Sequence, residues 1–139
     1  MGEPTIGSKT ILLVDDDIVV LNALTIVLQA SGHKVLKAFS GGEIPAIARQ
    51  QQVDLIFLDL VFPPDSENFG SPLHNGLFVV EWLNRTSETQ NIPVAIISST
   101  EPAKYQKQAL KAGVIGCLQK PLNKDEVLGI IEKKFGKTS

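Results

Sequence analysis

Five short apolar runs alternate along this chain with segments in which apolar residues recur at helical spacing. The third run is almost continuously apolar up to Asp59 and therefore predicts a strand that is covered on both faces. The runs that we interpret as strands span residues 10–14, 35–38, 53–60, 92–97 and 114–118. Strands that alternate with helices through short connections predict an α/β domain with a parallel sheet, helices on both faces and right-handed crossovers.

The segments between these runs carry helix signals. We expect helices over about 17–32, 40–51, 76–85, 102–112 and 123–135. In the third of these helices, the residues expected to face the core are Leu77, Val80, Trp82 and Leu83.

The start of the second helix has two interpretations. Ser40 and Glu43 have the spacing of a capping box, which would start the helix directly after Ser40. Pro45 would then lie in the helix body and forfeit a backbone hydrogen bond, which favours a start near Ile44 instead. The sequence leaves both starts open.

Length and composition indicate one domain. A chain of 139 residues with 43% hydrophobic content is long enough for one well-buried core and too short for two ordinary domains. We assign 10–135 to this domain, 1–9 to an N-terminal tail and 136–139 to a C-terminal tail.

The charge pattern argues against several kinds of partner. A net charge of -2, with acids and bases spread along the chain, gives no footprint for direct nucleic-acid binding and no face for a membrane. No apolar run approaches the ~18 residues of a membrane-spanning helix. The single Cys117 forms no internal disulfide and is interpreted as a small buried hydrophobic residue. These features predict a cytoplasmic protein in a reducing compartment.

Complementary polar groups follow four of the predicted strands. Asp15 and Asp16 come after the first strand, Asp59 ends the third, Ser98 follows the fourth and Lys120 follows the fifth. Parallel strands point their carboxyl ends to one edge of the sheet, where ligand sites of open α/β sheets form. We therefore expect these five side chains to gather in one site.

This set of groups favours phosphoryl chemistry. Carboxylates about 4 Å apart repel by ~4 kcal/mol at an effective dielectric of 20, so the acids call for a cation, and oxygen ligands suit Mg²⁺. Asp59 is ionised at pH 7 and needs no general base to act as a nucleophile. Lys120 and the Ser98 hydroxyl would contact the oxygens of a phosphoryl group on Asp59. The expected product is an aspartyl phosphate.

Four blocks carry a family resemblance: ILLVDDD at 11–17, VDLIFLDL at 53–60, IPVAIISS at 92–99 and GCLQKP at 116–121. Together they resemble the receiver domains of two-component response regulators, in particular the single-domain chemotaxis-type regulators. The resemblance covers about residues 10–135 and implies a flavodoxin-like doubly wound (βα)5 three-layer sandwich with a five-stranded parallel sheet in the order 2-1-3-4-5. It implies a signalling phosphoacceptor in a phosphorelay, which is not an enzyme acting on a separate substrate.

The resemblance also implies partners and a metal site. A histidine kinase or a histidine phosphotransfer protein would be the donor, and an output domain or a downstream protein would be the target. Asp59 would be the phosphoacceptor, and Asp15, Asp16, Asp59 and the backbone carbonyl of Val61 would bind Mg²⁺.

The remaining roles come from the same resemblance. Ser98 would be the switch hydroxyl, and Lys120 would contact the phosphate next to a cis-prolyl bond at Pro121. Asp17 lies beyond the acidic pair and is expected to be an acid in the first turn of its helix.

Three departures from the family bear on signalling. The connection over 63–76 is longer than the usual loop, Ser99 stands where Ala is common, and Cys117 stands at the switch position where a Tyr or Phe changes rotamer on activation. Cys117 is too small for that rotamer change. We therefore expect the response to phosphorylation to appear in the segment 62–75.

Two alternatives stay open. A pseudo-receiver would bind a partner without phosphorylation, but such domains usually lose an acid or the lysine. A metal-dependent phosphatase with an aspartyl nucleophile typically has a second acid two residues further on, where this chain has Val61.

His33 and His74 have no neighbouring ligand pattern and are interpreted as ordinary surface residues.

Overall fold

The computed structural model describes residues 7–61 and 77–137. Five strands form one parallel sheet in the order β2-β1-β3-β4-β5. This is the predicted flavodoxin-like strand order. The strands are β1 (Thr10–Val14), β2 (Lys34–Ala38), β3 (Leu55–Asp59), β4 (Val94–Ser98) and β5 (Gly116–Gln119).

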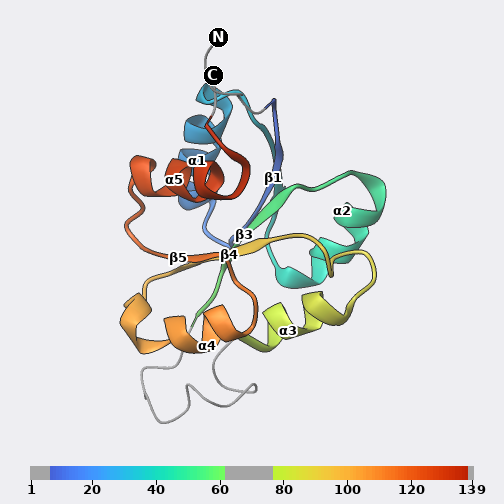
Figure 1. Cartoon of the computed structure of the whole chain (residues 1–139). Coiled ribbons are helices and arrows are strands. Elements are labelled where there is room, and N and C mark those ends of the chain that lie inside the picture. The colour runs from blue at the N-terminus through green and yellow to red at the C-terminus, as the bar shows by residue number, and fades with distance from the viewer. Residues whose placement is uncertain (1–6, 62–76, 138–139) are drawn as a thin grey trace.

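Helices cover both faces of the sheet, as Figure 1 shows. One apolar core lies under α1 (Ile18–Ala30) and α5 (Lys124–Phe135). The other lies under α2 (Ile44–Gln50), α3 (Leu77–Arg85) and α4 (Gln106–Lys111). The predicted three-layer arrangement is therefore confirmed. β3 runs through the middle of the sheet, and Leu55, Ile56 and Phe57 in it are fully buried.

Both interpretations of the second helix describe part of the structure. The 3-10 turn η1 (Gly41–Glu43) follows Ser40, and Glu43 Oε2 accepts a hydrogen bond from the Ser40 backbone N–H at 2.9 Å. The α-helix itself begins at Ile44 and places Pro45 in its first turn, where the missing N–H is tolerated. The capping box therefore starts a 3-10 turn, and the proline starts the α-helix.

The expected helix over 102–112 is also divided. Its first turn is the 3-10 helix η3 (Pro102–Lys104), and α4 begins only at Gln106. Tyr105 separates the two with φ −138° and ψ −9°.

The placement of Trp82 in the core was wrong, because its side chain is 40% exposed. Leu77, Val80 and Leu83 are buried, at a spacing of three residues along α3. Successive residues of a helix are turned by about 100° around its axis, so Trp82 points well away from the stripe that faces the sheet. A short helix on a sheet buries only this one stripe.

The interpretation of His33 as a surface residue was also wrong. Its side chain is 5% exposed, in the turn between α1 and β2, and its Nδ1 accepts a hydrogen bond from the Lys9 backbone N–H at 3.1 Å. Burial, and secondly the positive charge of Lys9, lower the pKa of His33. The neutral ring thus anchors the segment that leads into β1. His74 lies outside the described residues.

We expect His33 to make folding sensitive to mild acid. Protonation removes the acceptor of the Lys9 hydrogen bond, and the folded-state pKa lies below the unfolded value of 6.5. The stabilisation is therefore complete above about pH 6.5 and is lost as the pH falls through the folded-state pKa. The measurement is urea unfolding between pH 7.5 and 5. His33→Asn keeps an acceptor that does not titrate, so the wild type should lose unfolding free energy relative to this variant as the pH falls over this range. Equal pH slopes for wild type and variant would contradict the role of His33.

Candidate functional site

The first strand delivers its acids to the carboxyl edge of the sheet in three different roles. Asp15 is 2% exposed, and its Oδ1 accepts a hydrogen bond from the Asp17 backbone N–H at 2.9 Å. Asp16 is exposed. Asp17 was expected in the first turn of the helix, but it is instead the N-cap of α1. Its Oδ1 accepts a hydrogen bond from the Val19 backbone N–H at 2.9 Å. Capping explains why Asp17 stands apart from the acidic pair.

Lys120 joins the first and third strands at this edge. Its Nζ lies 2.9 Å from Asp15 Oδ2 and 3.0 Å from Asp59 Oδ1. The Lys120 backbone N–H donates to the Ser98 carbonyl at 2.8 Å, which fixes the start of the Lys120 side chain beside β4. The Lys120–Pro121 peptide bond is cis. One ammonium group thus contacts two carboxylates from different strands.

Three carboxylates surround a point at which a cation would fit. Asp15, Asp16 and Asp59 each offer an oxygen, and these oxygens all lie within 4.8 Å of one another. Lys120 supplies one positive charge against three negative ones. Oxygen donors of this kind, open to solvent on one side through Asp16, suit Mg²⁺ with retained waters. The donor set therefore fits the expected metal.

Burial raises the pKa of Asp59 from 3.8 to about 6. The hydrogen bond from Lys120 lowers it and the charge of Asp15 raises it, so the rise is the net result. Burial lowers the pKa of Lys120, but its hydrogen bonds to Asp15 and Asp59 outweigh burial and the net direction is upward. Lys120 is therefore held in its charged form, and the pKa of Asp59 stays raised in spite of this contact.

Ser98 completes the edge from the fourth strand. Its side chain is 1% exposed, and its Oγ accepts a hydrogen bond from the Thr100 backbone N–H at 3.1 Å. Ser98, Asp59 and Lys120 line one pocket of about 290 Å³. Val61 lines the same pocket and is 84% exposed, two residues beyond Asp59. The structure thus brings the residues expected from the strand ends into one site.

Cys117 lies away from this pocket. It is half-buried on β5, in register with Ile96 of β4, and packs against the core beneath α4. The fully buried Tyr105 belongs to the same core, a position that the sequence did not predict. The spacing of Tyr105 and Ala109, both fully buried, is a helical signal that could have identified this inward-facing tyrosine. The segment 62–75, where a response to phosphorylation was expected, lies outside the described residues.

Comparison with known proteins assigns the chain to a family. The model of the response regulator receiver domain matches residues 11–132, nearly the whole chain. The chain belongs to the response regulator receiver domain family. It is therefore a receiver domain of two-component signal transduction, and such domains act as signalling phosphoacceptors. A pseudo-receiver usually lacks one of the acids or the lysine, and here all of them are present, which disfavours that alternative.

Individual relatives agree in sequence and in fold. The protein PilH of Pseudomonas aeruginosa is 32% identical over 121 residues, which cover 87% of this chain and 93% of PilH. The chemotaxis protein CheY4 of Vibrio cholerae superposes with a TM-score of 0.72 at 25% identity. The superposed region covers 91% of this chain and 98% of CheY4.

A third protein with the same fold was solved with a metal. The receiver domain of the sensor histidine kinase PA1611 from Pseudomonas aeruginosa superposes with a TM-score of 0.70 at 20% identity, over 91% of this chain and 97% of that one. Its structure has a magnesium ion coordinated in the active-site cleft.

In the part of this chain that the structure describes, no helix is long and apolar enough to span a bilayer.

Proposed function

We propose that Asp59 of this receiver domain accepts a phosphoryl group from a phosphohistidine donor in a Mg²⁺-dependent step. The phosphorylated state then changes binding to an output domain or a downstream protein. The observation that carries the proposal is the position of Lys120, whose Nζ lies 3.0 Å from Asp59 and 2.9 Å from Asp15 beside a third carboxylate. A phosphoryl group on Asp59 would meet this preplaced positive charge.

Each residue has a defined part in the transfer. An Asp59 carboxylate oxygen attacks phosphorus, the new O–P bond forms as the P–N bond to the donor breaks, and the imidazole leaves with the electron pair. Lys120 balances charge on one phosphoryl oxygen, and the Ser98 hydroxyl donates to another. Asp15, Asp16, Asp59 and the Val61 carbonyl would hold Mg²⁺, which when bound neutralises the charge of the acids and of the phosphoryl oxygens. The chain acts on itself and not on a separate substrate.

The direct test is to locate the phosphoryl group. After incubation with acetyl phosphate and Mg²⁺, intact mass should show one added phosphoryl group, and hydroxylamine, which cleaves acyl phosphates, should remove it. Reduction with borohydride followed by peptide mass spectrometry should convert only Asp59 to homoserine. Modification at another residue, or an adduct that resists hydroxylamine, would contradict the assignment of Asp59.

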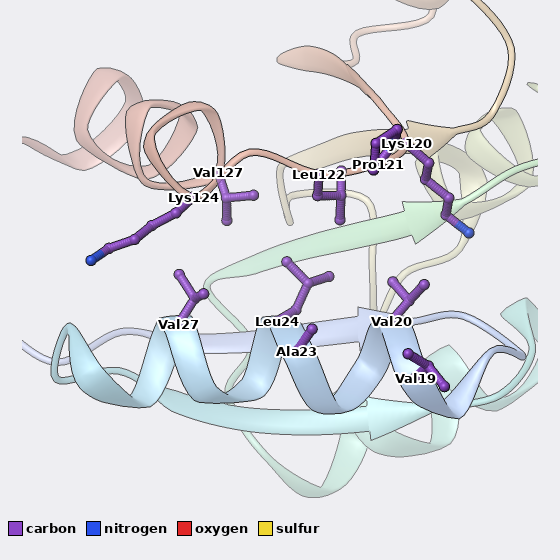
Figure 2. A pocket seen from close by; sticks show the side chains of 10 residues that line it. All are labelled: Val19, Val20, Ala23, Leu24, Val27, Lys120, Pro121, Leu122, Lys124 and Val127. Atoms are coloured by element: carbon purple, nitrogen blue, oxygen red, sulfur yellow. The ribbon is translucent and has the colours of Figure 1, made fainter.

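A groove beside the site would fit a helix of the phosphohistidine donor. Apolar side chains of α1, among them Val20, Leu24 and Val27, face Leu122 and Val127 across a groove of about 290 Å³ (Figure 2). Lys120 lines both this groove and the pocket at Asp59. A helix that laid an apolar face in the groove would thus bring a phosphohistidine on it close to Asp59.

Charge in the groove should block transfer from a protein donor only. We expect Ala23→Glu, which places a carboxylate in the apolar lining, to slow transfer from a phosphorylated histidine phosphotransfer protein by at least about tenfold, the effect of ~1.4 kcal/mol. The measurement is the rate of label transfer from a donor that phosphorylates the wild type. The matched control is Ile26→Glu, because Ile26 is 69% exposed on the same helix and does not line the groove. Phosphorylation by acetyl phosphate should be unchanged in both variants. Equal slowing by both variants would show that the groove is not the donor surface.

A further inference from the structure

The outer face of α1 is apolar, although it points into solvent. The helix contains no charged residue from Ile18 to Ala30, and on its surface Val19 is 71% exposed and Ile26 is 69% exposed. A surface helix normally turns charged and polar side chains to the side opposite the core. α5 covers the same face of the sheet and follows this rule, with lysines and acids among its exposed residues. The composition of α1 is instead that of a helix covered on both sides.

Four exposed apolar residues of α1 form one stripe, which we call the α1 stripe. Its members are Val19, Ala23, Ile26 and Ala30. Their spacing of four, three and four residues is that of the seam of a coiled coil. The buried residues Leu21, Leu24 and Leu28 lie on the opposite side of the helix, because successive residues turn by about 100° around its axis. The α1 stripe therefore faces directly away from the sheet and is open to a second helix.

The α1 stripe is complementary to itself. In an antiparallel pair of α1 helices around a twofold axis at the middle of the helix, Ala23 lies opposite Ile26 of the second copy. In the same register Val19 lies opposite Ala30 of the second copy. Each large side chain thus meets a small one, which lets two helices interlock at close distance. No like charges come together, because α1 carries no charge.

We propose that two copies of this chain pair through the α1 stripe in an antiparallel, twofold-symmetric contact. A contact of one helix with one helix lies below the roughly 1,200 Å² that stable interfaces bury, so the pair is weak and reversible. Val19 and Ala23 also line the groove proposed for the donor helix, so pairing covers one edge of that groove. Pairing does not depend on phosphorylation of Asp59 and is tested on the unphosphorylated chain.

Sedimentation equilibrium at increasing concentration measures the pairing. The weight-average mass of the wild type should rise at least about 1.5-fold between ~10 µM and ~1 mM, as for a dissociation constant of about 0.3 mM. Ile26→Glu should stay monomeric, because each copy would bury a carboxylate in the seam. The matched control is Leu110→Glu, which adds the same charge at a residue of α4 that is 54% exposed, and it should associate as the wild type does. The proposal would be overturned by a wild type that stays monomeric, by association that persists in Ile26→Glu, or by equal loss in both variants.

Disulfide formation tests the antiparallel register. In a Cys117→Ser background, which removes the single native cysteine, chains with Ala23→Cys are mixed with chains with Ile26→Cys at ~1 mM and oxidised in air. Because these two positions face one another across the axis, mixed dimers should form at least about fivefold faster than dimers of either variant alone. Intact mass separates the three species. Dimers of one variant alone that form as fast as the mixed dimers would indicate a parallel pair or random collision, and would overturn the proposal.

Discussion

Without Mg²⁺, phosphorylation of this domain by acetyl phosphate should slow by at least about 100-fold, which corresponds to ~2.7 kcal/mol of transition-state stabilisation. Asp15, Asp16 and Asp59 have oxygens within 4.8 Å of one another, and Lys120 supplies a single positive charge to them. An incoming phosphoryl group adds further negative charge that Lys120 alone does not balance. The rate is measured by intact mass over time, with Mg²⁺ or with excess chelator.

Asp16 offers a sharper test of the metal, because it is the exposed member of the cluster and has no part in the contacts of Lys120. Asp16→Asn should raise the Mg²⁺ concentration for half-maximal rate by at least about tenfold, since one ligand charge is lost. The matched control is Asp17→Asn, which removes the same charge one residue further on and keeps an equally good N-cap for α1. The same Mg²⁺ dependence in both variants, or a rate that chelator leaves unchanged, would contradict the metal site.

The arrangement of strands was predictable because it depends on local apolar runs. β1 has the predicted bounds, and β3 (Leu55–Asp59) lies within the predicted run 53–60 but is shorter at both ends. β5, by contrast, spans Gly116–Gln119 and not 114–118, because a strand is bounded by its pairing and Ala95 of β4 pairs with Gly116. Boundaries depend on the neighbouring strand, which a single run does not reveal.

The site was predictable because each of its side chains follows a strand. Once five strands are parallel, their ends share an edge, and this alone places Asp59 near Lys120 although they are far apart in sequence. The direction of side chains inside the helical layers is not set in this way. Trp82 and Tyr105 are both aromatic residues in predicted helices, yet Trp82 is 40% exposed and Tyr105 is fully buried. Their places depend on how each helix is rotated against the sheet, and for Tyr105 on the break between η3 and α4.

In the absence of Mg²⁺, the contribution of Asp59 to the stability of this domain should fall as the pH rises from about 4 to 7. Asp59 has a pKa of about 6 in the folded state and 3.8 as an unperturbed side chain, chiefly because it is buried. Between these two values the folded state holds a proton that the unfolded state has released, so stability is highest below the unfolded pKa and declines through the folded one. A difference of about two pKa units corresponds to about 2–3 kcal/mol, and the Asp59 side chain is only 12% exposed, so solvent screens little of it.

At pH 8 without Mg²⁺, urea unfolding of Asp59→Asn should therefore give a free energy of unfolding about 2–3 kcal/mol above that of the wild type. Near pH 4 the two free energies should be equal. His33 acts in the opposite direction below about pH 6.5, so the informative quantity is the difference between wild type and variant at each pH, from which the His33 contribution cancels. Mg²⁺ added at pH 8 should stabilise the wild type more than the variant, because the folded cluster binds the ion and Asn contributes no charge to it. If the difference between the two proteins did not change with pH, the folded-state pKa of Asp59 would be close to 3.8. Its burial beside Asp15 would then be fully offset by Lys120, and the site would need no cation for stability.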